Sequence, residues 1–238
     1  MICGIFHQGS GLGNQLHRYV GTKVKALDHN QEHGMIGTEL FKGGSFLNLN
    51  MGKSTNTSYV VEYPAGKVVP EGRDGLIIAD GEFQSEDDFI YRIDEVRDWL
   101  TVEPLDMPDD LCVINFRGGE YVGVPDLFLP REYWNKAIEM MRDKGITEFE
   151  VHTDDPITAS RFFPDFPIVS DISVNWRSIR YAKHLILSNS SFAILPAILN
   201  ENVEEIIAPL YWAGYNKGYW QLQQNNYKKF TYIHHETL

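Results

Sequence analysis

The chain has 238 residues, a formal charge of −12 at pH 7, 43% hydrophobic residues and 23% charged residues. These fractions are those of an ordinary globular protein, and the length suits one large domain or two small ones. The negative charge argues against a general nucleic-acid binder, which needs basic patches. An anionic ligand is still compatible with it, because one local cluster of positive charge can act within an acidic protein.

No apolar run is long enough to span a bilayer, and the first residues, Met1–His7, lack the basic segment of a signal peptide. The two cysteines, Cys3 and Cys112, fall in predicted strands. Two isolated thiols of this kind favour a reducing compartment over a disulfide framework. We therefore expect a cytoplasmic protein without a transmembrane segment.

The first half of the chain predicts one βα unit followed by less regular structure. In chain order we expect a strand at Met1–Gln8, a glycine loop at Gly9–Gln15, a helix at Leu16–Leu27, and a strand at Gly75–Ala79. Residues 30–70 predict only loops and short strands. Ser85 is the expected N-cap of a helix that ends at Leu100, since serine is a favoured cap and three acidic residues follow it.

A connector at Thr101–Asp110, with two prolines and several acids, predicts the domain boundary. The expected domains are residues 1–105 and 106–238. In the second domain we expect strands at Leu111–Arg117, Glu148–Thr153, Pro167–Val169, His184–Ser188 and Glu205–Ala208, with helices that start at Pro130, Pro156, Ser173 or Asn175, and Ser190 or Ser191. Strands that alternate with helices predict a parallel sheet covered on both faces.

The most informative segment is an apolar strand that ends in Arg117, Gly118, Gly119 and Glu120. The carboxyl edge of a parallel sheet is where open α/β folds bind ligands. A guanidinium suits phosphate oxygens, and glycine lets a ligand approach the backbone closely. The segment therefore predicts a site for a phosphorylated or nucleotide-linked substrate. A surface pair between Arg117 and Glu120 beside a turn is the alternative interpretation.

Two further polar clusters, Thr153–Pro156 and Ser188–Phe192, follow predicted strands and should reach the same edge of the sheet. Free N–H groups and hydroxyls at a helix N-terminus bind phosphate. The carboxylate of Asp154 or Asp155 can accept two hydrogen bonds from a purine with adjacent donors. Each cluster alone also fits a simple helix cap. Together with Arg117, the clusters favour a nucleotide-diphosphate site.

Other chemistries find less support in the sequence. The glycine loop has the setting of a dinucleotide fingerprint, but the third glycine of that pattern would fall on Asn14 or Leu16. This disfavours a nicotinamide-dependent oxidoreductase. The eight histidines show no metal-ligand spacing, so no metal site is predicted.

Five motifs resemble, in order along the chain, the inverting fucosyltransferases, specifically the bacterial α-1,2-fucosyltransferases and their α-1,6- and protein-O-fucosyltransferase relatives. The motifs are Gly11-Leu12-Gly13-Asn14-Gln15-Leu16, Gly81-Glu82-Phe83-Gln84-Ser85-Glu86, Asn115-Phe116-Arg117-Gly118-Gly119-Glu120-Tyr121, Thr153-Asp154-Asp155-Pro156 and Ser188-Asn189-Ser190-Ser191-Phe192. In the third motif Asn115, Gly118 and Glu120 replace the family's histidine, second arginine and aspartate. The chain is also short for that family.

The resemblance implies an α/β fold of the GT-B type, with two Rossmann-like halves that face each other across a cleft and a mainly parallel sheet in the C-terminal half. It implies that residues 1–105 take the acceptor and that residues 106–238 hold GDP-fucose or another GDP-sugar without a metal. It assigns the donor diphosphate to Arg117, with Asn115 beside it, and guanine to Asp154 or Asp155. The remaining donor and cleft positions are Ser190, Ser191, Phe192, Gly11, Gly13, Asn14 and Gln15.

The sequence therefore predicts a metal-independent inverting glycosyltransferase that moves fucose or a related sugar from a GDP-sugar to a glycan hydroxyl, for example on a cell-surface polysaccharide precursor. This reaction needs a stabilised leaving diphosphate, an oriented donor and a base for the acceptor hydroxyl. Arg117 is the candidate for the first task and Glu120 for the last. The alternative is a non-catalytic nucleotide-sugar or glycan-binding homologue of the same fold.

Overall fold

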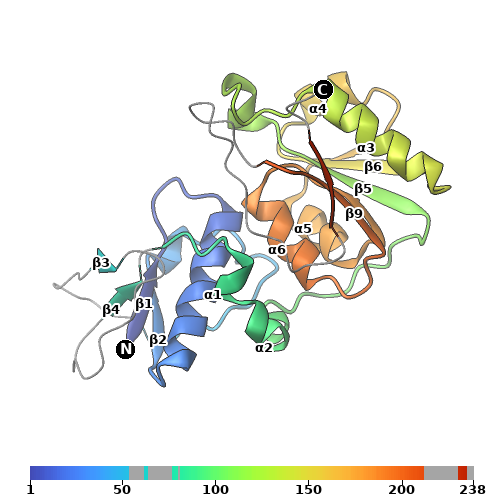
Figure 1. The fold of residues 1–238 in the computed structure, drawn as a ribbon. Coiled ribbons are helices and arrows are strands. Elements are labelled where there is room, and N and C mark those ends of the chain that lie inside the picture. Colours follow the sequence, from blue (N-terminus) through green and yellow to red (C-terminus); the bar gives the residue numbers. More distant parts are fainter. Residues whose placement is uncertain (54–61, 64–76, 80, 212–229, 235–238) are drawn as a thin grey trace. The chain divides into compact units, whose positions relative to one another are not determined.

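The computed structural model divides the chain into two compact units, Met1–Val102 and Glu103–Leu238 (Figure 1). It describes residues 1–53, 62–63, 77–79, 81–211 and 230–234. The division falls inside the predicted connector Thr101–Asp110. Each unit is an α/β structure with its own parallel sheet. The predicted α/β class is therefore confirmed in both halves.

The first unit is built on a four-stranded sheet in the order β2-β1-β4-β3, in which every pairing is parallel. Its strands are β1 (Ile2–Ile5), β2 (His33–Ile36), β3 (Glu62–Tyr63) and β4 (Ile77–Ala79). Because β1 lies between β2 and β4, the loops after β1 and β4 leave this sheet side by side at its carboxyl edge. The residues before Ile77 in the predicted strand Gly75–Ala79 lie outside the described part of the chain.

Helix α1 (Leu12–Asp28) starts four residues earlier than predicted. Gly11 is its N-cap, so Gly13, Asn14 and Gln15 lie in the first turn of the helix and not in a loop. The reason is that Leu12 is buried and extends the apolar stripe of the helix by one turn. A short 3₁₀ turn, η1 (Thr38–Leu40), follows β2.

The helix predicted from Ser85 to Leu100 is broken into three pieces. Ser85 caps as predicted, but it caps a 3₁₀ turn, η2 (Glu86–Asp88). A second turn, η3 (Ile90–Arg92), and helix α2 (Ile93–Trp99) follow it. The break comes at Phe89, whose φ of −150° and ψ of −12° leave the helical path while its ring is completely buried.

The second unit contains a six-stranded sheet in the order β10-β9-β8-β5-β6-β7, again with every pairing parallel. Its strands are β5 (Leu111–Phe116), β6 (Glu148–Thr153), β7 (Ile168–Val169), β8 (His184–Ile186), β9 (Glu205–Pro209) and β10 (Phe230–Ile233). Numbered from β5, and read from β7 to β10, this is the order 3-2-1-4-5-6 of the doubly wound nucleotide-binding fold.

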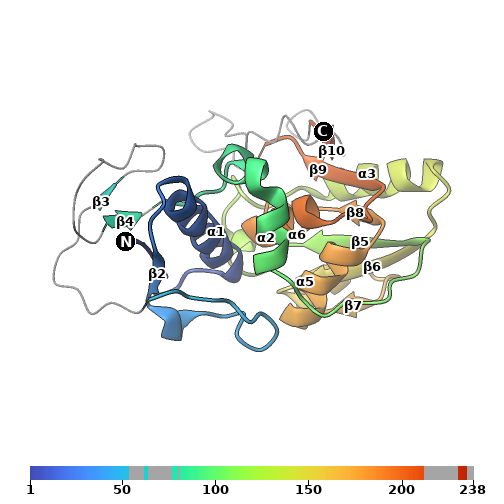
Figure 2. The same ribbon diagram turned by 90° about the horizontal axis from the view of Figure 1, so that it is seen from below.

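Helices cover both faces of this second sheet, as Figures 1 and 2 show. One face carries α3 (Arg131–Asp143) and α4 (Pro156–Phe162), and the other carries α5 (Ile172–Tyr181) and α6 (Ser191–Leu199). An apolar cluster on the α3 side of β5 and β6 includes Phe116 and Trp134, whose ring centroids lie 5.4 Å apart. The N-cap of α5 is Asp171, not the predicted Ser173 or Asn175, because its carboxylate accepts from Val174 N at 2.9 Å.

Strand β10 was missed because, among the described strands, it pairs with β9 alone and its first three residues are only partly buried, which leaves a weak sequence signal. Cys3 and Cys112 are buried thiols in β1 and β5, and burial raises the pKa of the Cys112 thiol. Within the described part of the chain, no helix is long and apolar enough to cross a membrane.

Candidate functional site

The carboxyl ends of β5 and β8 meet at the switch point of the second sheet, where the strand order reverses direction. Open α/β sheets bind ligands in the crevice outside such a switch point. Arg117 directly follows β5, and the Ser188–Phe192 cluster follows β8. Asp154 and Asp155 follow β6, the neighbour of β5. The three predicted clusters of this unit therefore share one edge of the sheet.

Two carboxylates of the same unit hold Arg117. Its Nη1 donates to Asp154 Oδ2, and its Nη2 donates to Glu120 Oε1 at 3.0 Å. The guanidinium also lies over the ring of Tyr121, 5.2 Å from its centroid. The Arg117 side chain is 28% exposed. The pair between Arg117 and Glu120, which was the alternative interpretation of this segment, is present, and Asp154 is an additional partner that sequence reasoning did not foresee.

The two glycines after Arg117 make room for these carboxylates. Gly118 N donates to Asp154 Oδ1 at 3.0 Å, and Gly119 N donates to Asp155 Oδ2 at 3.3 Å. A Cβ on Gly118 would lie 2.6 Å from Asp155 Cβ, and one on Gly119, whose φ is +46°, would lie 2.5 Å from Asp154 Oδ2. The close approach that we expected from a ligand is thus made by Asp154 and Asp155.

This packing explains one departure from the fucosyltransferase-like pattern. The position of the family's second arginine is Gly118, where a Cβ would collide with Asp155. A side chain larger than that of glycine fits at position 118 only if Asp155 moves. Gly118 and Asp155 are therefore coupled, and Arg117 is left as the single arginine of this segment.

The turn after β6 also serves as the cap of α4. Asp155 Oδ1 accepts from Thr158 N at 3.0 Å, with Pro156 in the first turn, as the cap interpretation of this segment predicted. Hydrogen bonds from the side chain and backbone of Thr158, and from Gly119, lower the pKa of Asp155. A purine would have to compete with Arg117 and Gly118 for Asp154. The guanine-binding role of the two aspartates stays a prediction.

The cluster after β8 combines a helix cap with buried hydrogen bonds. Ser190 caps α6, since its Oγ accepts from Phe192 N at 3.3 Å. Ser188 Oγ donates to Asn115 Oδ1 at 2.6 Å. Asn115 and Ser190 are each 5% exposed, whereas Ser191 and Phe192 are partly exposed. Asn115 therefore ties β5 to the end of β8, and the partly exposed residues here are those at the start of α6.

The glycine-loop residues of the first unit divide into an outer and an inner pair. Gly11 is exposed, and Asn14 is partly exposed and accepts from Gln84 Nε2 at 3.0 Å. Gly13 and Gln15 are buried. Gln15 Nε2 donates to the carbonyl of Leu40 at 2.7 Å, and its Oε1 accepts from Lys42 N at 3.0 Å. Gln15, one of the four residues expected at a cleft border, instead links α1 to the η1 segment through these two hydrogen bonds.

Sequence reasoning missed a strained group in the same unit. Phe83 has a φ of +49°, which is rare for a residue other than glycine. Its ring occupies the space that a side chain on Gly21 would need, only 2.1 Å from the Cβ position. Next to it, Arg18 donates to Glu82, and His17 Nδ1 lies 3.0 Å from the carbonyl of Phe83. The available signal was a glycine in the middle of an amphipathic helix.

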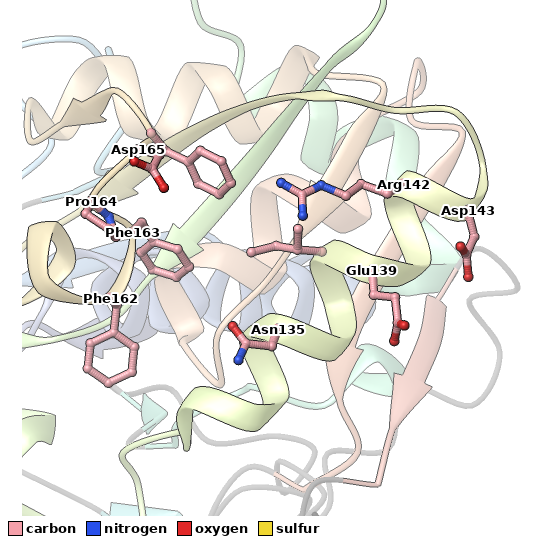
Figure 3. Close-up of a pocket in the computed structure, with 10 residues that line it drawn as sticks. Asn135, Glu139, Arg142, Asp143, Phe162, Phe163, Pro164 and Asp165 are labelled. Atoms are coloured by element: carbon pink, nitrogen blue, oxygen red, sulfur yellow. The ribbon is translucent and has the colours of Figure 1, made fainter.

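A separate cavity of about 490 Å³ lies in the second unit between α3 and the loop after α4 (Figure 3). Its lining residues are Asn135, Ile138, Glu139, Arg142, Asp143, Phe162, Phe163, Pro164, Asp165 and Phe166. It contains none of the predicted site residues. Among the residues that the structure describes, no group of three or more histidine, cysteine, aspartate and glutamate side chains could hold a metal ion.

No protein-family profile and no curated protein matches the chain. Among solved structures, the chain is similar to the α-1,6-fucosyltransferase NodZ soaked with GDP-fucose, with 12% identity, a TM-score of 0.47, and coverage of 87% of this chain and 94% of that chain. It is also similar to the E. coli heptosyltransferase WaaC with ADP, with 13% identity, a TM-score of 0.45, and coverage of 98% and 93%. Both TM-scores are below 0.5, so the fold assignment rests on the two parallel sheets themselves.

Proposed function

We propose that this protein is a glycosyltransferase that takes its sugar from a nucleotide-diphosphate donor, GDP-fucose or another GDP-sugar, and transfers it to a glycan hydroxyl. The observation that carries this proposal is the position of Arg117, which follows β5 at the switch point of a doubly wound sheet. The five fucosyltransferase-like motifs support the class of donor. The partly exposed start of α6 lies at the same edge.

The proposed role of Arg117 is to bind the donor diphosphate and to stabilise the charge that grows on it as the sugar–phosphate bond breaks. Fixed donors aimed at a leaving group act in this way, and the arginine fork matches phosphate oxygens. The nine-residue helix α6 adds the positive end of its dipole, since its N-terminus follows β8 and its first turn contains no acidic residue. The reaction needs no metal on this proposal, since Arg117 and α6 supply the positive charge.

Transfer with inversion also needs a base that removes the proton of the acceptor hydroxyl. We assign this role to Glu120, whose side chain is 75% exposed and lies 3.0 Å from Arg117. Its ion pair with Arg117 occupies one carboxylate oxygen. A diphosphate that engages Arg117 would free that oxygen to accept a proton. On the same proposal, residues 1–105 take the acceptor and residues 106–238 take the donor.

The donor site is tested by calorimetric titration with GDP, GDP-fucose, GDP-mannose, UDP-glucose and NAD, without added metal. We expect selective binding of the GDP ligands. A charged hydrogen bond contributes about 1.5–3 kcal/mol, so Arg117→Ala should weaken that binding about 10- to 100-fold. The matched control is Arg142→Ala, which removes an arginine of α3 that lines the separate cavity (Figure 3) and should change binding less than twofold. A wild type that binds no GDP ligand would overturn the proposal.

The non-catalytic alternative is favoured by one observation, namely that Asp154 and Glu120 already occupy Arg117. Turnover separates the two functions. The protein is incubated with GDP-fucose and a panel of mono- and oligosaccharide acceptors, and release of GDP is followed with time. An enzyme releases GDP in step with a fucosylated product. A binding protein retains GDP-fucose with neither hydrolysis nor transfer.

A further inference from the structure

A chain of hydrogen-bonded polar groups lies on the α5 side of β6, directly before the Asp154 turn. His152 belongs to β6, and its side chain is completely buried. Its ring lies between the side chains of Glu150, also in β6, and Asn175, in α5. Its Nε2 lies 2.8 Å from Glu150 Oε1, and its Nδ1 lies 2.9 Å from Asn175 Oδ1. None of these three residues belongs to the motifs or to the proposed reaction. The hydrogen-bond partners at the two ring nitrogens determine which nitrogen of His152 carries a proton.

The carbonyl of Thr153 fixes the orientation of the Asn175 amide. Asn175 Nδ2 donates to Thr153 O at 3.3 Å, and a carbonyl oxygen can only accept. The amide oxygen of Asn175 therefore faces His152, and His152 Nδ1 has to be the donor. A neutral imidazole carries only one N–H. If His152 were neutral and Glu150 ionised, the lone pair of Nε2 would face a carboxylate oxygen at 2.8 Å.

A proton between His152 Nε2 and Glu150 Oε1 removes this conflict. If this proton is bound to Nε2, the two side chains form an imidazolium–carboxylate pair. If it is bound to Oε1, Glu150 is a carboxylic acid that donates a hydrogen bond to Nε2. Burial lowers the pKa of His152, and the charge of Glu150 opposes that shift. The residues in register with His152 on the neighbouring strands are Asn115 and Val169, neither of which titrates.

Asn175 transmits this arrangement to the turn that carries the two aspartates. Thr153 is held twice, because Asn175 binds its carbonyl and its own Oγ1 accepts from Asp155 N at 2.9 Å. The next two residues, Asp154 and Asp155, hold the backbone N–H groups of Gly118 and Gly119. The direction in which the chain leaves β5, and with it the position of Arg117, thus depends on this turn.

We propose that Glu150 and His152 share one proton, and that Asn175, whose amide oxygen faces His152, is a positioning residue that fixes the turn on which Arg117 is anchored. The effect on donor binding rests on the proposed function. The shared proton and the order of the turn do not rest on it, and they can be measured without any ligand.

The proton is tested by NMR of the full chain labelled with ¹⁵N at histidine. In the wild type we expect His152 to carry a proton on Nδ1 and a second, slowly exchanging proton in the contact with Glu150. In Glu150→Gln the new amide can donate to Nε2, so a neutral ring satisfies every partner and the second proton should be absent. A wild-type ring with a bare Nδ1 would overturn the proposal.

The turn is tested by hydrogen exchange in Asn175→Asp, which keeps an oxygen toward His152 but loses the donor to Thr153. The amides of Gly118 and Gly119 should exchange about tenfold faster, while those of β9 keep their protection and report that the sheet is folded. Glu150→Gln should change the two glycines less than twofold. Unchanged glycine exchange in folded Asn175→Asp would overturn the positioning role.

Titration with GDP tests whether the order of the turn affects donor binding. Asn175→Asp should weaken GDP binding about tenfold, and Glu150→Gln should weaken it less than twofold. If the wild type binds no GDP, the proposed function fails, while the NMR and exchange results still decide the proton and the turn. If the wild type and Asn175→Asp bind GDP equally well, the positioning role fails and the proposed function stands.

Discussion

At the carboxyl edge of the second sheet the motif residue Arg117 is charged and partly exposed, whereas at the same edge of the first sheet the motif residue Gln15 is neutral and buried. Arg117 is 28% exposed and bonded to two carboxylates. Gln15 has no exposed surface and is bonded to two backbone groups. The difference teaches that membership of a motif does not assign a role. Arg117 has the charge and exposure that a ligand requires, and Gln15 has neither.

The largest expected effect comes from the first unit, at Gly21 in the middle of α1. In Gly21→Ala the new Cβ would lie 2.1 Å from the ring of Phe83, which is buried and already strained in its backbone. Overpacking of this kind costs roughly 1–3 kcal/mol, occasionally more, and we expect about 3 kcal/mol of lost unfolding free energy in urea denaturation. The control is Gly44→Ala in the same unit, where the nearest atom is 4.0 Å away. Equal stability of the two variants would contradict this account of Phe83.

Gln15→Ala directly tests the contrast between the two edges. It leaves the Leu40 carbonyl and the Lys42 N–H without their partner, and a buried unsatisfied group costs about 1–3 kcal/mol. We expect about 2 kcal/mol of lost stability and unchanged GDP affinity for the protein that remains folded. Arg117→Ala should do the reverse, with weak binding and little loss of stability. A GDP affinity that falls in Gln15→Ala would return Gln15 to the binding site.

The sequence predicted the elements whose signal is local. The strand Glu148–Thr153 was predicted with the right bounds, because a run of buried residues determines it. The start of the next helix at Pro156 was also predicted correctly, because a first-turn proline determines it. The pairing of Arg117 with Asp154 could not be predicted in this way. It joins residues 37 positions apart, and it depends on the register that sets Phe116 opposite Thr153.

The remaining errors have the same origin. The break at Phe89 follows from the burial of one ring, and the cap at Asp171 follows from a choice among several candidate caps. The positions of the site clusters were predictable, because parallel strands bring their carboxyl ends to one edge. Their mutual hydrogen bonds were not predictable, since these depend on side-chain directions that no periodicity encodes.

A smaller loss of stability is expected for Gly118→Ala. In Gly118→Ala the new Cβ meets Asp155 Cβ at 2.6 Å, and the exposed loop can relax in part, so we expect a loss of about 1–2 kcal/mol. Gly123→Ala, which has no atom within 4 Å of its Cβ position, is the control. If Asp155 is the obstacle, the cost of Gly118→Ala should fall when it is introduced into Asp155→Gly. An additive double variant would place the obstacle elsewhere.

The smallest effect concerns the pH dependence of stability at the second edge. Hydrogen bonds from Thr158 and Gly119 lower the pKa of Asp155 in the folded state, so the unfolded state binds the proton more readily. The resulting stabilisation is present above the unfolded pKa of about 3.9 and is lost as the pH falls through the lower folded value. Asp155→Asn keeps a capping oxygen but cannot ionise. The melting temperature of the wild type should therefore exceed that of Asp155→Asn slightly at neutral pH, and the difference should shrink as the pH falls below about 4. A difference that stays constant down to low pH would mean that the carboxylate charge contributes nothing to the turn on which Arg117 is anchored.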